Sequence, residues 1–402
     1  MKDPVLWAEN NMKKLNDSHL GIMGLNEVNK AAAFHRSFPQ YSRTPLARLD
    51  KMASFLGIGE LYIKDESYRF GLNAFKVLGG SYAIARYIAQ KTGRDISELP
   101  YQTLTSDELR NEFGQATFFT ATDGNHGRGV AWAANQLKQQ SVVFMPKGTS
   151  QARLRNVQKK HASATIEDVN YDACVRMAVA AAEKTPNGVV IQDTAWEGYE
   201  EIPSWIMQGY GTMVMEADEQ LEEYGCGRPT HVFIQAGVGS LASAVSGYFA
   251  NRYPENPPAV VVIEASAAAC LYKGALAGDG NCRIVDGDLE TIMAGLACGE
   301  PNTIAWDILK NHVRIFVSCP DWVALKGMRM SAAPLKGDPQ VISGESGAVG
   351  LGLLASIMAM EEYKELRSVI GLNPDSKVLL FSTEGDTDPE RFKSIVWEGK
   401  NR

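Results

Sequence analysis

The chain has 402 residues, 45% of them hydrophobic and 22% charged, and a formal net charge of −7. This length predicts two domains, or one large α/β domain with a subdomain, and the acidic balance argues against a nucleic-acid surface. No apolar run approaches the roughly 18 residues of a membrane span and the first residues lack a signal-peptide core, so we expect a cytoplasmic protein without a membrane partner.

Short β-rich runs alternate with helical stretches from about residue 60 onward. The predicted strands cover residues 61–64, 118–121, 141–145, 165–167, 189–192, 231–235, 260–264 and 378–382, and the predicted helices cover 80–90, 127–138, 173–184 and 240–251. Nearly continuous apolar strands in such an alternation predict mostly parallel sheets with helices on both faces. Weak signals near residues 115 and 195 place a larger domain over 1–115 and 196–402 and a smaller one over 116–195.

The first chemical motif surrounds Lys76, in the run Asn73-Ala74-Phe75-Lys76-Val77-Leu78-Gly79-Gly80. Desolvation by apolar neighbours favours the neutral amine, which can condense with an aldehyde. Taken by itself, the same lysine is also compatible with the solvated start of a helix.

A strand-to-helix turn follows at Thr120-Ala121-Thr122-Asp123-Gly124-Asn125-His126-Gly127. Successive backbone N–H groups in such a turn can hold a substrate carboxylate, and the Asn125 amide can donate to a phenolate-like oxygen. His126 is equally explained as a structural histidine, and Asp123 as a helix N-cap.

A glycine-rich loop, Gln235-Ala236-Gly237-Val238-Gly239-Ser240-Leu241-Ala242, lies between a strand and a helix. Glycines let the backbone approach an anion, and a helix N-terminus offers unpaired N–H groups. The loop also fits a dinucleotide fingerprint, with Glu264 as the ribose-binding acid, so a nicotinamide site, another phosphate site and a simple turn all remain open.

The last strand is followed by Ser382-Thr383-Glu384-Gly385-Asp386-Thr387-Asp388. A hydroxyl here can face the ring nitrogen of a cofactor, whereas the three acids are also compatible with metal ligands or a solvated turn. We predict no metal. The six dispersed cysteines show no zinc spacing, and whether Cys270, Cys282 or Cys298 pair is open.

These motifs together resemble the fold type II pyridoxal-phosphate enzymes. Lys64-Asp65-Glu66-Ser67 before the lysine run, the Asp123–Gly127 turn, Gly344-Glu345-Ser346-Gly347-Ala348 and Ser382 carry the resemblance. It implies two open, mostly parallel twisted sheets flanked by helices, with a larger cofactor domain and a smaller mobile domain.

Within that superfamily the chain is most similar to the diaminopropionate ammonia-lyase family. Asp123 stands where relatives carry serine or threonine, and residues 191–199, 293–301 and 382–388 are further marks. The implied reaction is the α,β-elimination of D- and L-2,3-diaminopropionate to pyruvate and two ammonia molecules, by a homodimer. The alternatives are a serine or threonine dehydratase or a β-replacement enzyme, a nicotinamide-dependent dehydrogenase and a non-catalytic ligand-binding protein.

The resemblance also implies a role for each site residue. Lys76 holds pyridoxal 5'-phosphate as a Schiff base, Asp123 and Asp193 act in catalysis, and Asp123 serves as a base on the face of Cα opposite Lys76. The expected cofactor contacts are Lys76, Asn125, Gly237, Val238, Gly239, Ser240, Leu241 and Ser382. The expected substrate contacts are Thr122, Asp123, Gly124, Asn125, His126, Tyr171 and Asp193.

Overall fold

The computed structural model describes residues 3–12, 17–122 and 124–400, and Asp123 therefore lies outside the described residues. The chain divides into two compact units. Unit 1 comprises residues 1–25, 43–74 and 213–402, and unit 2 comprises residues 26–42 and 75–212.

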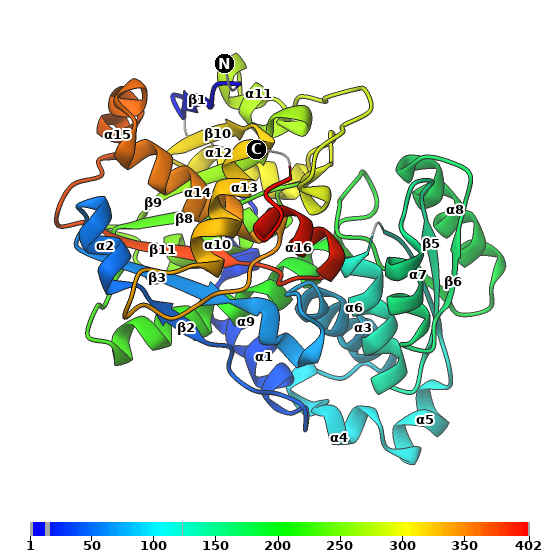
Figure 1. The fold of residues 1–402 in the computed structure, drawn as a ribbon. Helices are drawn as coiled ribbons and strands as arrows, with labels where there is room; N and C mark the ends of the chain where they lie inside the picture. The colour runs from blue at the N-terminus through cyan, green and yellow to red at the C-terminus, as the bar shows by residue number, and fades with distance from the viewer. Residues whose placement is uncertain (1–2, 13–16, 123, 401–402) are drawn as a thin grey trace. The chain divides into compact units, whose positions relative to one another are not determined.

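Unit 1 is built on a seven-stranded sheet with the strand order β1-β10-β9-β8-β11-β3-β2 (Figure 1). The five central strands are parallel, and the two short edge strands β1 and β2 pair antiparallel to their neighbours. The strands are β1 (Leu6–Glu9), β2 (Leu46–Arg48), β3 (Glu60–Asp65), β8 (His231–Gln235), β9 (Ala259–Ala265), β10 (Ile315–Cys319) and β11 (Lys377–Ser382).

Helices cover the apolar side chains of this sheet, except that α16 packs on α13. They are α2 (Asp50–Leu56), α10 (Ser240–Arg252), α11 (Cys270–Ala277), α12 (Thr303–His312), α13 (Asp321–Ala332), α14 (Glu345–Ala359), α15 (Lys364–Ile370) and α16 (Pro389–Val396). Every residue of β8 and of β10 is buried, as expected for parallel strands covered on both faces.

Unit 2 contains a four-stranded, wholly parallel sheet in the order β6-β5-β4-β7. Its strands are β4 (Thr117–Ala121), β5 (Gln140–Met145), β6 (Ser163–Ile166) and β7 (Gly188–Val190). Its helices are α1 (Leu25–Arg36, from Asn26 onward), α3 (Val77–Thr92), α4 (Tyr101–Leu104), α5 (Asp107–Phe113), α6 (Asn125–Gln136), α7 (Gln151–Gln158) and α8 (Tyr171–Lys184). Helix α9 (Glu201–Glu223) belongs to both units: residues up to 212 are assigned to unit 2, and residues from 213 onward to unit 1.

The predicted strands and helices agree with the structure, and the fold of two mostly parallel sheets flanked by helices is confirmed. Three strands were not predicted, β1, β2 and β10. The span predicted for the smaller domain, 116–195, holds all four strands of unit 2, but that unit is wider. It includes α3 because this helix packs on α6: a Cβ on Gly80 would lie 3.2 Å from Val130.

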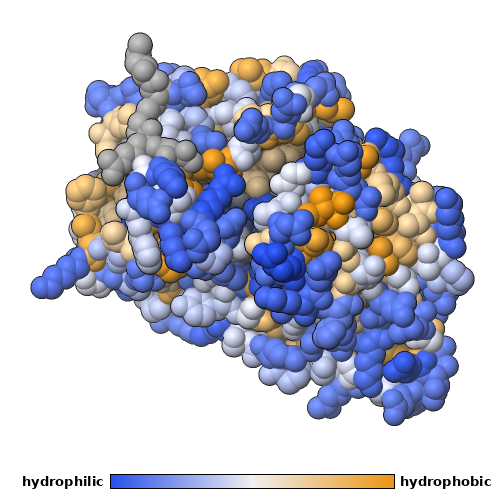
Figure 2. All heavy atoms as spheres, turned by 45° about the vertical axis from the view of Figure 1, so that its right-hand side comes forward, coloured by the Kyte–Doolittle hydropathy of each residue, from blue (hydrophilic) through white to orange (hydrophobic). Residues whose placement is uncertain are grey.

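Hydrophobic residues are mostly buried in the cores of the units. Figure 2 shows that on one face the exposed hydrophobic residues gather in separate groups between hydrophilic ones. Within the described residues, no helix combines the length and the apolar character needed to cross a membrane.

Candidate active site

An ion pair between Lys76 and Asp193 is the chemical centre of unit 2. Lys76 immediately precedes α3, and its neighbours Phe75, Val77 and Leu78 are buried, as predicted. Its Nζ donates a hydrogen bond of 2.7 Å to Asp193 Oδ2, and the two side chains are 22% and 9% exposed. The lysine therefore has a carboxylate partner in addition to the apolar surroundings that the sequence predicted.

Asp193 follows β7 and is held in its ionised form. Burial raises its pKa, but the positive charges of Lys76 and His126 outweigh burial and lower the pKa to about 2. His126 Nε2 donates to the Ile191 carbonyl over 2.9 Å, which fixes the ring, and Nδ1 lies 3.9 Å from Asp193 Oδ2. His126 thus has the structural bond that one interpretation required and also faces the carboxylate.

Gln192 connects Asp193 with the predicted substrate residue Tyr171. Its Nε2 donates to Tyr171 Oη over 2.5 Å and to the Ala121 carbonyl over 3.1 Å, while its Oε1 accepts from the Ala121 N–H. Tyr171 is the first residue of α8. The sequence contained Gln192 only as part of a family mark, and its role in joining the ends of β4 and β7 was not predicted.

The predicted carboxylate turn has the expected position, between β4 and α6. Thr122 Oγ1 accepts a hydrogen bond of 2.9 Å from the Gly124 N–H, and Asn125 begins α6. The following glycines are needed for packing: a Cβ on Gly127 would lie 2.2 Å from Thr122 Cγ2, and one on Gly129 would lie 2.8 Å from Val77 Cα. Gly129 therefore permits close contact between α6 and the start of α3, and Gly127 permits close contact of α6 with Thr122 and with Val143 of β5.

In unit 1, the glycine-rich loop ends at the N-terminus of α10. Gly239 adopts φ +101° as the N-cap residue, and a Cβ on Gly237 would lie 3.1 Å from the Gly295 carbonyl oxygen. Asn302, the N-cap residue of α12, holds the loop: its N–H donates to the Val238 carbonyl and its side chain donates to Ser240 Oγ. A fixed backbone at a helix start suits a phosphate ester.

Glu264 does not serve as a ribose-binding acid. It is fully buried and accepts hydrogen bonds from the Leu271 and Tyr272 N–H groups, at 2.8 and 2.6 Å. Both oxygens of its side chain therefore bind backbone N–H groups in the first turn of α11. The interpretation of the loop as a dinucleotide site requires a free acid at this position, and Glu264 does not provide one.

Ser382 ends β11 and is 1% exposed. Its hydroxyl lies 2.8 Å from Ser343 Oγ, a partner that the sequence did not indicate. The three acids after this strand have separate local roles. Glu384 accepts from the Ser346 N–H, Asp386 accepts from Asn73, and Asp388 caps α16. Within the described part of the chain, no group of three or more His, Cys, Asp or Glu side chains is placed to hold a metal.

All six cysteines are free thiols, so Cys270, Cys282 and Cys298 do not pair.

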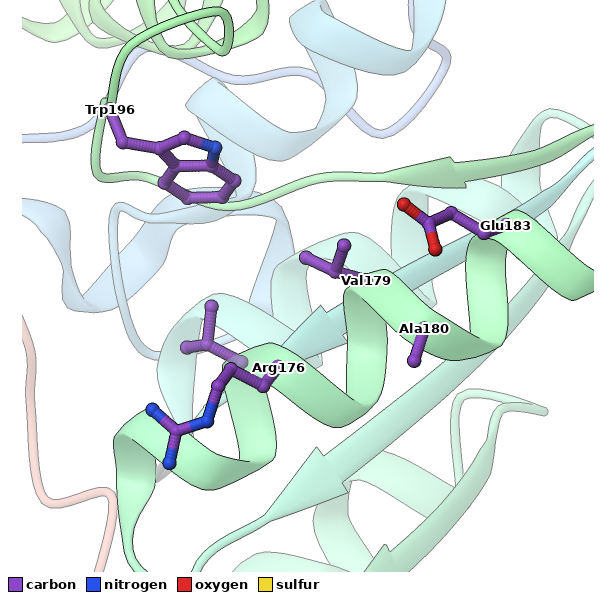
Figure 3. A pocket seen from close by; sticks show the side chains of 6 residues that line it. Arg176, Val179, Ala180, Glu183 and Trp196 are labelled. Atoms are coloured by element: carbon purple, nitrogen blue, oxygen red, sulfur yellow. The ribbon is translucent and has the colours of Figure 1, made fainter.

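A groove of about 330 Å³ runs along α8 in unit 2, lined by Val175, Arg176, Val179, Ala180, Glu183 and Trp196. Figure 3 shows the Trp196 ring on its loop facing the side chains of α8. None of the predicted site residues lines this groove.

The residues present fit pyridoxal phosphate. Each unit has residue types that this cofactor needs: unit 2 holds a lysine beside a carboxylate, and unit 1 holds a phosphate-type loop with little room for a side chain at Gly237 and a buried hydroxyl at the end of β11. Fold and residues together define a fold type II pyridoxal-phosphate enzyme.

Comparison with known proteins agrees. Residues 38–375 match the family described as "Pyridoxal-phosphate dependent enzyme", to which the chain belongs, and more narrowly it falls among the diaminopropionate ammonia-lyases. It is 50% identical to the diaminopropionate ammonia-lyase of Salmonella typhimurium, with 95% of each chain covered. It is 46% identical to that of Escherichia coli, over 97% of this chain and 96% of the relative.

Solved structures give the same result. The holo form of the Escherichia coli enzyme matches with a TM-score of 0.91 and 44% identity, covering 100% of this chain and 98% of that chain. A tomato threonine deaminase, 19% identical with a TM-score of 0.72, shares the fold alone. The predicted family, fold, cofactor and lyase class are confirmed.

Proposed function

We propose that the chain catalyses the α,β-elimination of 2,3-diaminopropionate, consuming one water and releasing pyruvate and two ammonia molecules. The observation that carries this proposal is the 2.7 Å ion pair between Lys76 and an Asp193 carboxylate that stays ionised. A dehydratase must accommodate a neutral hydroxyl, whereas this substrate brings a second amine that is protonated at neutral pH.

Asp193 is suited to bind that second amine. A buried carboxylate attracts an ammonium group more strongly than a solvated one, because the surrounding medium screens the charges less. The β-amine leaves readily only when protonated, so a carboxylate beside it also keeps it in the reactive form. When Lys76 moves from Asp193 to the cofactor, the substrate ammonium can replace it as the positive partner.

Other residues have complementary roles in this proposal. Bound pyridoxal phosphate supplies an electron sink for the charge that develops at Cα. The turn at Thr122, Gly124 and Asn125 binds the substrate carboxylate, Lys76 moves the proton on one face of Cα, and Asp123 does so on the other. Residues 237–241 hold the phosphate, and Ser382 faces the ring nitrogen without holding it protonated as an acid would.

The test is product stoichiometry. The full chain loaded with pyridoxal phosphate is given D- or L-2,3-diaminopropionate, and pyruvate and ammonia are assayed separately. We expect two ammonia molecules for each pyruvate from both isomers, and much slower release from serine and threonine. Faster turnover of serine or threonine would establish a dehydratase instead.

The lysine assignment has its own test. Borohydride reduction of the loaded protein followed by peptide mass mapping should place the pyridoxyl group on Lys76. Lys64 is the matched control because it is buried and fully paired with Glu216, Gln220 and the Thr44 carbonyl. Label on any lysine other than Lys76 would contradict the assignment.

We also propose that the enzyme is a cytoplasmic homodimer, by analogy with the family. Light scattering coupled to size exclusion should give twice the mass of the chain. A monomer mass under conditions of full activity would contradict this proposal.

A further inference from the structure

Tyr199 lies at the open edge of the four-stranded sheet of unit 2. Strand β7 is the last in the order of this sheet, so among the described residues no further strand pairs with its outer edge. On the inner side, the Ile191 N–H donates to the Phe119 carbonyl of β4 over 2.8 Å. Alternate residues of a strand direct their N–H and C=O groups to opposite sides, so Val190 and Gln192 present theirs to the open edge.

The Tyr199 hydroxyl takes the place of a neighbouring strand at this edge. It accepts a hydrogen bond of 2.8 Å from the Gln192 N–H and donates one of 3.0 Å to the Val190 carbonyl. In a parallel ladder, one residue of the next strand would make this pair of bonds with its own C=O and N–H. A tyrosine hydroxyl can accept and donate at once, whereas phenylalanine can do neither.

A four-residue turn brings the phenol back to the strand. Trp196 and Tyr199 pair through their backbones, and Gly198 adopts φ +84° between them. Their rings stack with centroids 4.1 Å apart and planes inclined by 17°. Trp196 in turn faces α8 (Figure 3). The paired backbone, the left-handed glycine and the stacked rings together restrict where the phenol can lie.

These bonds act on the residue immediately before Asp193. Gln192 is held on two sides, because its side chain donates to Tyr171 and its N–H donates to Tyr199. One residue further along, Asp193 Oδ2 accepts the 2.7 Å hydrogen bond from Lys76. The position of this carboxylate therefore depends on a backbone that the Tyr199 hydroxyl fixes from the open edge.

We propose that Tyr199 is a positioning residue, whose hydroxyl sets the place of the Asp193 carboxylate and thereby the preference for a substrate with a second ammonium group. The inference rests on the proposed function, in which Asp193 binds that ammonium. An ion pair in a partly dry site weakens quickly as its atoms separate, and a small displacement of a binding group is enough to slow a reaction.

The first test needs no cofactor. Thermal midpoints of the cofactor-free protein are measured for the parent, Tyr199→Phe, Asp193→Asn and the double variant. Without the hydroxyl the carboxylate is less well placed for Lys76. Asp193→Asn should therefore lower the midpoint in the Tyr199→Phe background by less than about half of its effect in the parent. Additive losses would overturn the proposal, because a hydroxyl that only stabilises the fold acts independently of the carboxylate.

The second test compares two substrates of the loaded enzyme. 3-Chloroalanine has the carboxylate and α-amine of 2,3-diaminopropionate, but its leaving group carries no positive charge. We expect Tyr199→Phe to lower kcat/KM for diaminopropionate by about 10-fold, the scale of one hydrogen bond, and to leave that for 3-chloroalanine within about twofold. The ratio of the two values does not depend on how much of the protein is folded. An equal fall with both substrates would overturn the proposal.

Tyr224→Phe is the matched control. Tyr224 also binds an edge strand through its phenol, donating to the Leu46 carbonyl of β2 over 3.2 Å, but both residues belong to unit 1. No predicted site residue adjoins Leu46 in the chain, so this variant should leave the substrate ratio unchanged.

A milder variant covers the case in which Tyr199→Phe does not fold. Gly198→Ala strains the turn at φ +84° but has open space for its methyl group, and it should change both tests in the same direction. Failure of the proposed function would be seen separately, as a parent protein that releases no pyruvate from diaminopropionate. The double-mutant cycle would still show whether Tyr199 and Asp193 are coupled.

Discussion

At the scale of single residues, the cofactor-free site depends on the mutual stabilisation of Lys76 and Asp193. The pKa of Asp193, about 2, lies below the ordinary value of 3.8. A carboxyl group whose pKa is lower in the folded state adds stability above its unfolded pKa and loses it as the pH falls towards the folded value.

We therefore expect Asp193→Asn to destabilise the cofactor-free protein by about 2 kcal/mol at neutral pH, with the difference shrinking below about pH 4. Denaturant unfolding of parent and variant at several pH values measures this. The control is Asp168→Asn, which removes an exposed partner of Lys147 and should change nothing measurable. A difference that stays constant with pH would show that the loss is one of packing.

Asp123 is expected to serve one isomer more than the other. In the proposed function Lys76 reaches only one face of Cα, so proton removal on the opposite face needs a second base. Asp123→Asn keeps the size of the side chain and its hydrogen-bonding capacity but cannot accept a proton. Activity on the D-isomer should fall by a factor on the order of 10² or more, and activity on the L-isomer should fall less. If activity on the two isomers fell equally in the product assays, Asp123 would only bind the substrate and would not act as a base.

At the scale of elements, the phosphate loop depends on a backbone that only glycine adopts readily. Gly239→Glu combines an unfavourable φ with a negative charge where we propose that the phosphate binds, so cofactor retention should be lost. Gly225→Glu is the control, because Gly225 also has a positive φ, of +73°, but has open space around it. Absorbance of the dialysed variants measures retention. Equal loss in both would point to backbone strain alone.

The sequence predicted the positions of strands correctly where apolar residues form a continuous run. Residues 260–263 are four consecutive aliphatic side chains, and β9 is buried accordingly. The edge strands β1 and β2 have only four and three residues, too few for a pattern, and they are defined by pairing with distant partners.

The site was predictable to a similar degree. The neighbours of Lys76 and the turn at 122–126 consist of residues that are adjacent along the chain, so the sequence predicted them directly. Asp193, 117 positions further along, was predicted only through family resemblance. Ser343 shows no pattern in sequence, since its contact with Ser382 at the end of a strand gives it its place.

At the scale of the whole molecule, a buried charge cluster in unit 1 stabilises the segment after β3. Glu216, on α9, accepts hydrogen bonds from Lys64 and from two nitrogens of Arg69, and Arg69 also pairs with Glu66. Burial raises the pKa of Glu216, but Arg69 and Lys64 outweigh burial and hold that pKa below its ordinary value. The two cations and two anions neutralise one another without help from solvent.

Removing one charge from this cluster should therefore cost more than removing a surface charge. Glu216→Gln leaves two buried cations facing one carboxylate, and we expect the free energy of unfolding to fall by about 3–5 kcal/mol. Glu223 lies on the same helix and forms an exposed ion pair with Arg43. Because exposed pairs contribute little, Glu223→Gln should leave the free energy of unfolding unchanged. Denaturant unfolding of the parent and of both variants measures these free energies. Similar stabilities would mean that the network relaxes around the missing charge, and a further variant, Arg69→Met with Glu216→Gln, should then be no less stable than Glu216→Gln alone.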